Sequence, residues 1–503
     1  MADCYLGVDV GTTNIKTVAF TTDGTERARA DRENKVQRPQ EGWEEQDMDV
    51  TWSRTAETIR EVIETLTPED TVSGLGVTGQ GGGCWLVAGD GEPVRDAVLW
   101  TDARAADIVT TWREDGTYED LFNRCGYGVF PGMPVSILRW FREHEPSVLE
   151  RADKIVFCKD WIRFRLTGNV ASDYADMSLA HHDVCGEGYL ADVPNIVGMP
   201  ELAQLEPQLQ SPTSLAGTVT TDAAAATGLD PNTPVVTGTI DVAASAFGSG
   251  VDTPGEGSTV VGTTLQNQVL MERPRIVQPI TGYTLDLGIN GMGLRAIGAM
   301  TGTPNLDWAR EHLAETADFE DTEAAAKSVP VGADGVLYHP YLNTAGEKAP
   351  FVDPAARAQF VGIGPTHSRA HLLRAVYEGV AFAVRDCYES LPGGSSKVTI
   401  SGGGSRSGFW CQLFADCLGV EVTVPAGTEL GAKGAAILAT VGTGQYSEFE
   451  TAIDVMTETS GQYTPRSDVV TRYDRLYEYY SAVYESMSEV WSLRQSLRTE
   501  LDL

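Results

Sequence analysis

Apolar and polar positions near the start of the chain follow the pattern of a short β-hairpin, and the same pattern returns in the second half. Residues 5–10 and 15–20 are strand-like and flank the turn Gly11-Thr12-Thr13-Asn14. Residues 259–261 and 265–270 flank Gly262-Thr263-Thr264 in the same way. Because one unit recurs after about 250 residues, the sequence predicts two domains built on one plan. We expect them to be 1–248 and 249–503, with the boundary in the Gly-rich segment 247–257.

Between and after the hairpins, helical and strand-like patterns alternate. Residues 51–66 and 155–166 have helical spacing, and 72–77 reads as a strand. In the second half, an apolar face predicts a helix from about Arg369, followed by a strand over 397–401. Aromatic and aliphatic residues at helical period from Tyr473 to Val490 predict a long C-terminal helical stretch whose stripe packs into the core. This alternation favours an α/β layered fold.

The charge balance excludes one large class of partners. The chain of 503 residues has 71 acidic and 37 basic side chains, for a net charge of −34. No window has the clustered Lys and Arg that a phosphate backbone needs, so we expect no nucleic acid partner. Only eight of the basic residues are lysines, and a surface rich in carboxylates suggests a high-salt cytoplasm, as in a halophile.

Neither export nor a membrane is expected from the sequence. The start, MADCYLGVDV, has no basic segment followed by a long apolar one, and no apolar run reaches 18 residues. The sequence therefore predicts a cytoplasmic protein. Its eight cysteines include no C-x-x-C pair, which argues against a metal or disulfide framework.

Common nucleotide-binding motifs are missing or out of context. Glycine is never followed by lysine, so a P-loop is excluded. Residues 74–79 fit G-x-G-x-x-G, but Gln80 and three glycines follow where a helix should open, which argues against a dinucleotide fold.

The first hairpin itself is a candidate phosphate site. Gly11 allows a ligand to approach the backbone, Thr12 and Thr13 offer hydroxyl and N–H groups, and Asp9 is placed to hold Mg²⁺ directly or through water. The alternative is an ordinary hairpin with Asp9 as a turn carboxylate. The recurrence at 262–264 favours the functional interpretation, because two such turns could hold a polyphosphate.

Further motifs follow the first hairpin in a fixed order along the chain. They are residues 42–47, 76–87, 97–105, 158–168, 237–241, 260–264, 300–308, 346–364, 369–382 and 401–419. Individually several of them are weak, but together they cover nearly the whole chain. In this order they resemble the motifs of the FGGY carbohydrate kinases, which are members of the actin-like ATPase superfamily.

The resemblance implies two actin-like (ribonuclease H-like) α/β domains with an ATP and sugar cleft between them, and ATP with Mg²⁺ as cofactors. In the family pattern the catalytic base is Asp241, although a carboxylate there could simply cap the following helix. Asp9 would act on Mg²⁺, and the nucleotide and its phosphates would meet Gly11, Thr12, Thr13, Gly262, Thr263, Thr264, Gly302, Asn305, Gly402, Gly403 and Ser405. For residues 402–404 a plain Gly-rich turn is the alternative.

On the sugar side the resemblance points to Gln80, Trp100, Asp102 and Arg104, together with Asp241. The alternative for Asp102 and Arg104 is a surface ion pair. We expect a ketopentose such as xylulose as the substrate, and erythritol, gluconate and glycerol are alternatives within the family. From a different class, an actin-like ATP-switch protein without sugar phosphorylation stays open. The resemblance also suggests a homodimer.

Overall fold

The computed structural model describes residues 2–314 and 318–501, and the chain falls into two compact units. Unit 1 contains the residues up to Asp252, together with Met271–Leu294 and Gly427–Glu458. Unit 2 contains Thr253–Leu270, Arg295–Ala426 and the residues from Thr459 onwards. Residues 1, 315–317 and 502–503, which belong to the predicted domains 1–248 and 249–503, lie outside the described part.

Both predicted hairpins are present. In unit 1, β1 (Ala2–Val10) pairs antiparallel with β2 (Asn14–Thr21). In unit 2, β14 (Glu256–Val261) pairs in the same way with β15 (Leu265–Met271). The two turns close with similar hydrogen bonds, from Gly11 N–H to Asn14 O at 3.0 Å and from Gly262 N–H to Thr264 O at 3.1 Å. The repeated plan predicted from the sequence is therefore confirmed for these elements.

The sheet of unit 1 carries parallel strands at its centre. Its order is β11-β12-β5-β1-β2-β3, and β13 also pairs with β5. The pairs β1–β5 and β13–β5 are parallel, so the carboxyl ends of β1 and β13 lie at the same edge of the sheet. The strands not yet placed are β3 (Glu26–Glu33), β5 (Asp70–Gly79), β11 (Leu215–Thr218), β12 (Pro234–Val236) and β13 (Thr239–Ile240).

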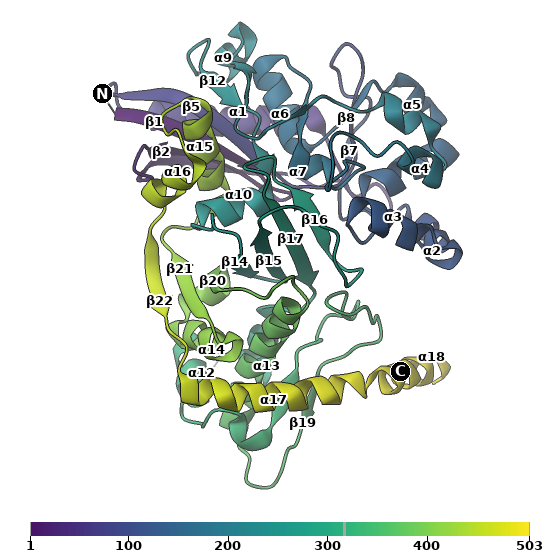
Figure 1. Ribbon diagram of the computed structural model, residues 1–503, viewed down its shortest axis with the longest axis vertical. Helices are drawn as coiled ribbons and strands as arrows, with labels where there is room; N and C mark the ends of the chain where they lie inside the picture. The colour runs from purple at the N-terminus through teal and green to yellow at the C-terminus, as the bar shows by residue number, and fades with distance from the viewer. Residues whose placement is uncertain (1, 315–317, 502–503) are drawn as a thin grey trace. The chain divides into compact units, whose positions relative to one another are not determined.

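Two helices rich in small residues pack closely in unit 1. Helix α10 (Asp241–Gly248) contacts α15 (Leu430–Gly442), and α15 lies against β1 and β5 (Figure 1). A Cβ added at Gly434 would come within 1.9 Å of Ala244 O, and one at Gly7 within 1.7 Å of Ala432 O. Only glycine permits such close backbone contact, so the small residues of α15 set its distance from β1 and α10.

The remaining elements of unit 1 surround this centre. The helices are α1 (Met48–Thr65), α2 (Ala106–Asp115), α3 (Thr117–Cys125), α4 (Pro134–His144), α5 (Pro146–Arg151), α6 (Cys158–Thr167), α7 (Tyr174–Met177), α8 (Val193–Ile196), α9 (Thr221–Thr227), α16 (Phe449–Met456) and the 3₁₀ turn η1 (Pro200–Gln204). The short strands are β4 (Glu45–Gln46), β6 (Trp85–Val87), β7 (Ala97–Val98), β8 (Lys154–Val156), β9 (Ser172–Asp173), β10 (Leu209–Gln210) and β16 (Tyr283–Asp286).

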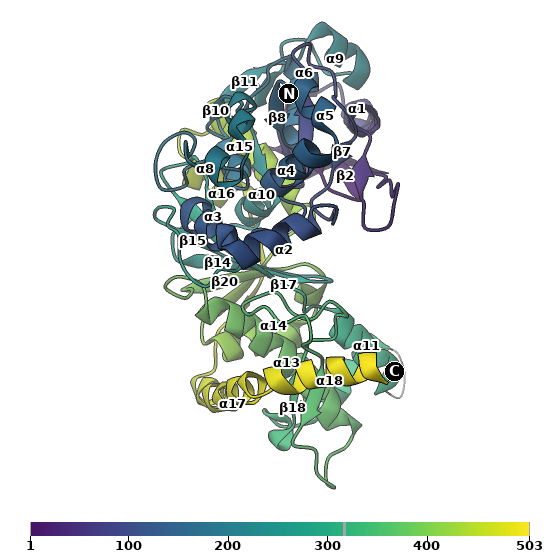
Figure 2. The ribbon, with the colours of Figure 1, turned by 90° about the vertical axis from the view of Figure 1, so that its right-hand side faces the viewer.

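The second mixed sheet has the order β16-β17-β15-β14-β20-β21-β22, and all of its strands except β16 lie wholly or mostly in unit 2. Its further strands are β17 (Gly293–Ala299), β20 (Lys397–Ser401), β21 (Glu421–Pro425) and β22 (Thr459–Tyr463), with the pair β18 (Leu337–His339) and β19 (Gln359–Val361) apart from it. The long helix α13 contacts α12 and α14, and α14 contacts α17; α13, α14 and α17 are seen together in Figure 2. The helices are α11 (Pro304–His312), α12 (Phe319–Lys327), α13 (Arg369–Glu389), α14 (Gly408–Leu418), α17 (Ser467–Glu485), α18 (Ser488–Glu500), η2 (Ala333–Gly335) and η3 (Gly403–Arg406).

Two sequence-based element assignments need correction. The pattern over 155–166 begins as a strand, because β8 includes Ile155 and Val156 and the helix α6 starts only at Cys158. The C-terminal stripe belongs to two helices, since α17 ends at Glu485 and α18 begins at Ser488. Apolar periodicity alone does not reveal the end of one helix and the start of the next, because the apolar stripe continues from α17 into α18.

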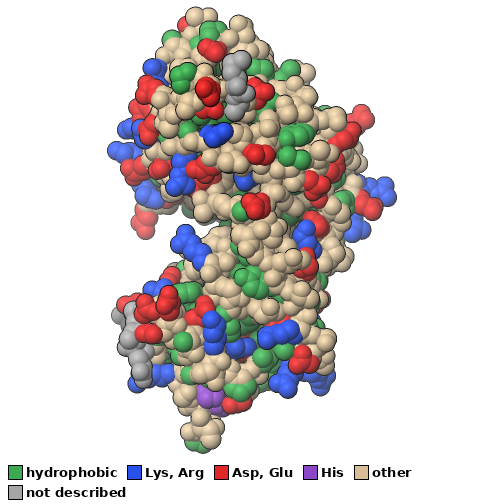
Figure 3. Space-filling model, turned by 90° about the vertical axis from the view of Figure 1, so that its left-hand side faces the viewer, with side chains coloured by type: hydrophobic (Ala, Val, Ile, Leu, Met, Phe, Trp, Pro, Cys, Tyr) green, Lys and Arg blue, Asp and Glu red, His purple; other side chains and the backbone are tan. Residues whose placement is uncertain are grey.

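The α/β fold class is confirmed. None of the helices in the described residues is both long and apolar enough to cross a membrane. On the face drawn in Figure 3, acidic and basic side chains are interspersed over the surface.

Candidate active site

The centre of the site in unit 1 is a pair of carboxylates at one edge of the sheet. Asp9 lies next to the end of β1, and Asp241 opens α10 directly after β13. Thr78 of β5 pairs with Asp9 on one side and with Thr239 on the other. The two segments are therefore two strand spacings apart, about 10 Å, and both deliver a carboxylate to the same edge.

Burial changes the acidity of both carboxylates. The pKa of Asp241 is raised from 3.8 to about 7: desolvation is the largest cause, the negative charge of Asp9 adds to the rise, and a hydrogen bond from Val242 N–H to Oδ1 at 2.8 Å opposes it. Desolvation also raises the pKa of Asp9, to about 6, with Lys16 lowering it and Glu429 raising it. Two carboxylates whose pKa values lie near neutrality are typical of a catalytic centre.

The first turn of α15 encloses Asp9. The sequence patterns do not predict this contact. A Cβ at Gly431 would lie 2.5 Å from Oδ2 of Asp9, so glycine is what allows the carboxylate to stand there. Lys16, opposite Asp9 in the hairpin, forms an ion pair with Glu429 at 2.7 Å. The positive end of the α15 dipole and Lys16 together favour the ionised form of Asp9.

A chain of hydrogen bonds joins the first hairpin to the predicted sugar side. The indole N–H of Trp100 donates to Oγ1 of Thr12 at 3.1 Å, and Thr12 donates to Oε1 of Gln80 at 2.8 Å. Gln80 donates to Oε1 of Gln46 at 2.7 Å, and Gln46 closes the loop by donating to the carbonyl of Thr12 at 2.7 Å. Thr13 is exposed at the tip of the turn. Trp100 is 39% exposed, so its ring is accessible while its edge is fixed.

Asp102 and Arg104 engage one another instead of presenting free polar groups. Oδ1 of Asp102 accepts from Nε of Arg104 at 2.8 Å, and Oδ2 accepts from Nη2 at 2.9 Å. Arg104 also donates to Glu45 at 2.6 Å, and its guanidinium lies 4.0 Å from the ring centroid of Trp43. The ion pair considered as an alternative in the sequence is therefore present, but it is buried, with both side chains fully enclosed. Of the side-chain polar atoms of this pair, Nη1 of Arg104 alone is buried without a hydrogen-bond partner among the described residues.

The predicted nucleotide segments of unit 2 meet at one edge of its sheet. Strand β20 runs parallel to β14, so the glycines after Ser401 emerge beside Val261 and the second hairpin. Gly402 has φ +81°, and a Cβ there would lie 2.7 Å from Val261 O. A Cβ at Gly302 would lie 2.4 Å from the carbonyls of Gly262 and Thr263. The segments at 262–264, 302 and 402–405, far apart in sequence, are thus brought together, with Thr263, Thr264, Gly402 and Gly403 exposed.

Asn305 and Ser405 are used within the unit. Asn305 is 2% exposed; it donates to Gly302 O at 3.2 Å and accepts from Tyr338 OH at 2.8 Å. Ser405 donates to Gly402 O at 2.8 Å. These bonds place both side chains as supports of the glycine turns.

Glu347 also supports the segment around Gly302. It lies within the motif at 346–364, but the sequence does not mark it as a site residue. Its buried carboxylate accepts hydrogen bonds from Met300 N–H at 2.7 Å, Lys348 N–H at 2.9 Å and Thr301 Oγ1 at 3.0 Å. It therefore fixes the segment that leads into Gly302.

Comparisons with known proteins decide the family. Residues 4–248 match the model for the N-terminal domain of the FGGY family of carbohydrate kinases, and residues 256–443 match the model for its C-terminal domain. The chain belongs to the FGGY family of carbohydrate kinases. As a member of this family it is a sugar kinase that uses ATP, which confirms the activity expected from the sequence.

Relatives that match nearly the whole length of the chain are named for different substrates. The chain is 30% identical to erythritol kinase of Brucella abortus, covering 97% of each chain. It is 30% identical to L-xylulose/3-keto-L-gulonate kinase of Escherichia coli, over 90% of this chain and 91% of that protein. The crystal structure of xylulose kinase from Rhodospirillum rubrum matches with a TM-score of 0.87 and 28% identity, covering 97% of this FGGY kinase and 99% of that chain.

Proposed function

We propose that this kinase transfers the γ-phosphoryl group of ATP to a hydroxyl of a ketopentose, with xylulose as the first candidate and Asp241 as the general base. The observation that carries the proposal is the pair Asp9 and Asp241, whose pKa values are raised to about 6 and about 7 at one sheet edge. A general base works best with a pKa near the pH at which it operates, because it must be ionised and still hold a proton well.

In this proposal Asp241 accepts the proton of the attacking hydroxyl while that oxygen approaches phosphorus. The hydrogen bond from Val242 N–H to Oδ1 fixes the carboxylate at the start of α10 and leaves Oδ2 for the substrate. Helix α10 ties this position to α15 through glycine contacts, so the base stands on a rigid element. A helix N-terminus lowers the pKa of a carboxylate, so the raised pKa of Asp241 comes from its burial and from the charge of Asp9.

The residues present fit a magnesium ion carried by the nucleotide. The described residues contain no group of three or more His, Cys, Asp or Glu side chains that could hold a metal, and Mg²⁺ with ATP needs only one or two carboxylates besides phosphate oxygens and water. Asp9 would be such a carboxylate. When bound, Mg²⁺ neutralises phosphate charge.

The exposed turns provide the phosphate and nucleotide contacts in this proposal. Thr12 is already oriented by Gln80 and Trp100, while the exposed Thr13 keeps its groups available. In unit 2 the exposed residues at 263–264 and 402–403 are the corresponding candidates. Neutral turns suit ATP on a chain of net charge −34, because they bind phosphate through N–H and hydroxyl groups without a basic surface.

Trp100 is the candidate sugar platform. Its exposed ring suits the C–H face of a polyhydroxylated ligand, and its hydrogen bond to Thr12 links that platform to the phosphate hairpin. We assign Asp102 and Arg104 an indirect part: their buried ion pair orders the segment that carries Trp100. A ketopentose is supported by the relatives named for xylulose and L-xylulose, and erythritol is the next candidate by name. We also propose a cytoplasmic location.

A coupled assay of ADP release tests the proposal. The panel is D-xylulose, L-xylulose, D-ribulose, erythritol, glycerol and gluconate, with and without Mg²⁺ and in low and molar KCl. We expect a ketopentose to give the highest kcat/KM, and Trp100→Ala to raise its KM while leaving the KM for ATP within about twofold. If a compound that is not a ketopentose gives the highest kcat/KM, the proposed substrate is wrong. If the rate does not depend on Mg²⁺, the proposed role of Asp9 is wrong.

A further inference from the structure

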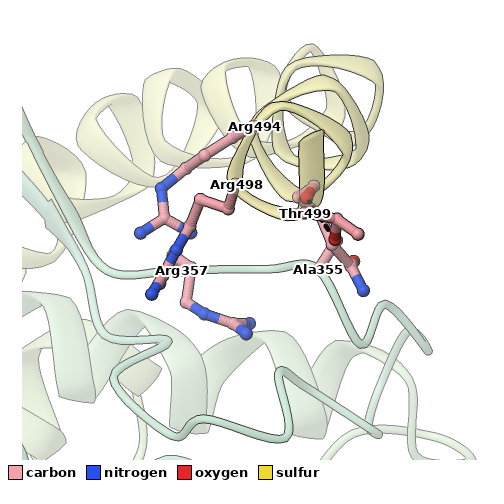
Figure 4. A pocket seen from close by; sticks show the side chains of 6 residues that line it. Ala355, Arg357, Arg494, Arg498 and Thr499 are labelled. Atoms are coloured by element: carbon pink, nitrogen blue, oxygen red, sulfur yellow. Dashed lines mark hydrogen bonds between the residues drawn. The ribbon is translucent and has the colours of Figure 1, made fainter. Parts of the chain in front are cut away.

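A pocket in unit 2 gathers arginine side chains away from the residues discussed so far. It has a volume of about 330 Å³ and lies between helix α18 and the loop before β19. Figure 4 shows Arg494 and Arg498 extending from the helix towards the loop that carries Arg357. Among the described residues its lining is Ala355, Arg357, Arg494, Gln495, Arg498 and Thr499, which includes three guanidinium groups and no carboxylate.

Arg357 is held in place with donors to spare. Its Nη1 donates to the carbonyls of Pro354 at 2.9 Å and Ala356 at 2.6 Å, and its Nη2 donates to Thr344 O at 2.9 Å. A guanidinium has five N–H donors, so two remain beyond these three bonds. Backbone carbonyls fix the group without neutralising its charge.

The helix wall of the pocket is also fixed. Trp491 of α18 is 3% exposed and stacks on Phe351 with ring centroids 6.4 Å apart and an angle of 8°. Tyr341 meets the same ring edge-on at 5.5 Å. Arg494 and Arg498 are four residues apart and therefore share one face of the helix. The aromatic packing thus sets the distance between that face and the loop with Arg357.

Like charges held together need a counter-charge. Elsewhere in unit 2, the buried Arg374 faces a carboxylate, that of Glu378, at 2.6 Å. By contrast, neither Arg357 nor Arg494 has a carboxylate within 4.0 Å among residues 2–314 and 318–501. Asp353, on the same loop, is engaged by Ala355 N–H at 2.8 Å and by Ser488 Oγ at 3.1 Å. Within the described part of the chain, Arg357 and Arg494 therefore keep their positive charges without a carboxylate partner, although the net charge of the chain is −34.

We propose that this pocket binds the phosphoryl group of a small phosphate monoester. Guanidinium forks match phosphate oxygens in pairs, and the side-chain amide of Gln495 on the same wall adds a neutral donor. Its volume lies at the lower end of the range for small-ligand pockets, about 300 to 1,000 Å³, which suits a phosphorylated sugar. All of its described lining belongs to unit 2 and includes neither Asp9 nor Asp241, so none of the residues of this site is shared with the proposed catalytic pair.

Calorimetric titration with ribose 5-phosphate and with inorganic phosphate, at constant ionic strength, tests this site. The hairpins of the proposed kinase site also bind phosphate, so the titration can show two classes of binding sites. The measured quantity is therefore the affinity of each class in the double variant Arg357→Ala/Arg494→Ala. We expect that variant to weaken one class at least tenfold. The matched control is Arg472→Ala, an exposed arginine of α17 in the same unit, which should bind as the unchanged protein does.

The two titrants separate the possible sources of the phosphoryl group. Tighter binding of ribose 5-phosphate supports an ester, whereas equal affinities lost together in the variant support a site for free phosphate and overturn the ester. Unchanged binding in the double variant overturns the site altogether. Should that variant not fold, a tungstate soak of crystals of the unchanged protein decides: an anomalous peak beside Arg357 and Arg494 supports the site, and no peak there overturns it.

Discussion

Replacing Asp241 by Asn should abolish most catalysis while making the folded protein more stable at alkaline pH. The folded state raises the pKa of Asp241 from 3.8 to about 7, so ionising this carboxylate costs folding free energy. The wild type therefore loses stability relative to the Asn variant as the pH rises from about 4 to about 7, and the difference levels off above that. At about 1.4 kcal/mol per pH unit, the difference should grow by about 2.5 kcal/mol between pH 5 and pH 8. Residual solvent contact of Asp241 makes this figure an upper bound.

Urea unfolding of both proteins at several pH values measures that difference directly. The control is Asp23→Asn, since hydrogen bonds from Thr21 and Thr25 lower the pKa of Asp23 and no gain at high pH is expected there. In the kinase assay, kcat of Asp241→Asn should fall by about 10² to 10⁴-fold, the usual contribution of a general base. The wild-type kcat/KM should rise with pH through about 7, as the base ionises. A variant that kept a tenth of the rate, or a stability difference independent of pH, would refute the reasoning.

Three further substitutions test the surroundings of the site. Gly431→Ala should push aside the carboxylate of Asp9, 2.5 Å from the new Cβ, and lower kcat/KM at least tenfold by initial rates; Gly89→Ala, with open space around it, should not. Arg104→Ala should cost about 3–5 kcal/mol in urea unfolding, because it leaves Asp102 buried without its partner; a loss below about 1 kcal/mol would contradict the buried pair. Glu347→Gln should raise the KM for ATP about tenfold and leave the KM for the sugar unchanged. The reason is that the new amide N–H₂ faces groups that donate hydrogen bonds to the carboxylate in the wild type. Equal changes in both KM values would count against that role.

The sequence was sufficient for the elements whose signals are local. Both hairpins, helix α1 and strand β20 lie where periodicity and turn glycines predict them. Those signals depend on neighbouring residues alone. The boundary between β8 and α6 was misplaced because apolar residues continue from strand to helix without a change in pattern. The break before α18 was missed for the same reason.

The environment of each site residue depends on long-range packing and could not be read from spacing. Asp9 and Asp241 were found by their place in motifs, but nothing near them in sequence reveals that Gly431 closes over Asp9. Likewise, the spacing of Asp102 and Arg104 fits a sugar contact as well as an ion pair. It is the ring of Trp43 and the carboxylate of Glu45 that enclose the guanidinium and make the pair a buried support.

The glycines of unit 1 connect the packing of the fold to the chemistry of the site. Gly7 lets α15 lie against β1, and Gly434 lets α10 lie against α15. This close packing removes water from the segment ends that carry Asp9 and Asp241, and desolvation is the largest cause of both raised pKa values. A looser arrangement with alanine at these contacts would admit water and return the carboxylates towards their ordinary acidity. The small residues that look like simple helix filling in the sequence therefore help to set the proton affinity of the proposed base.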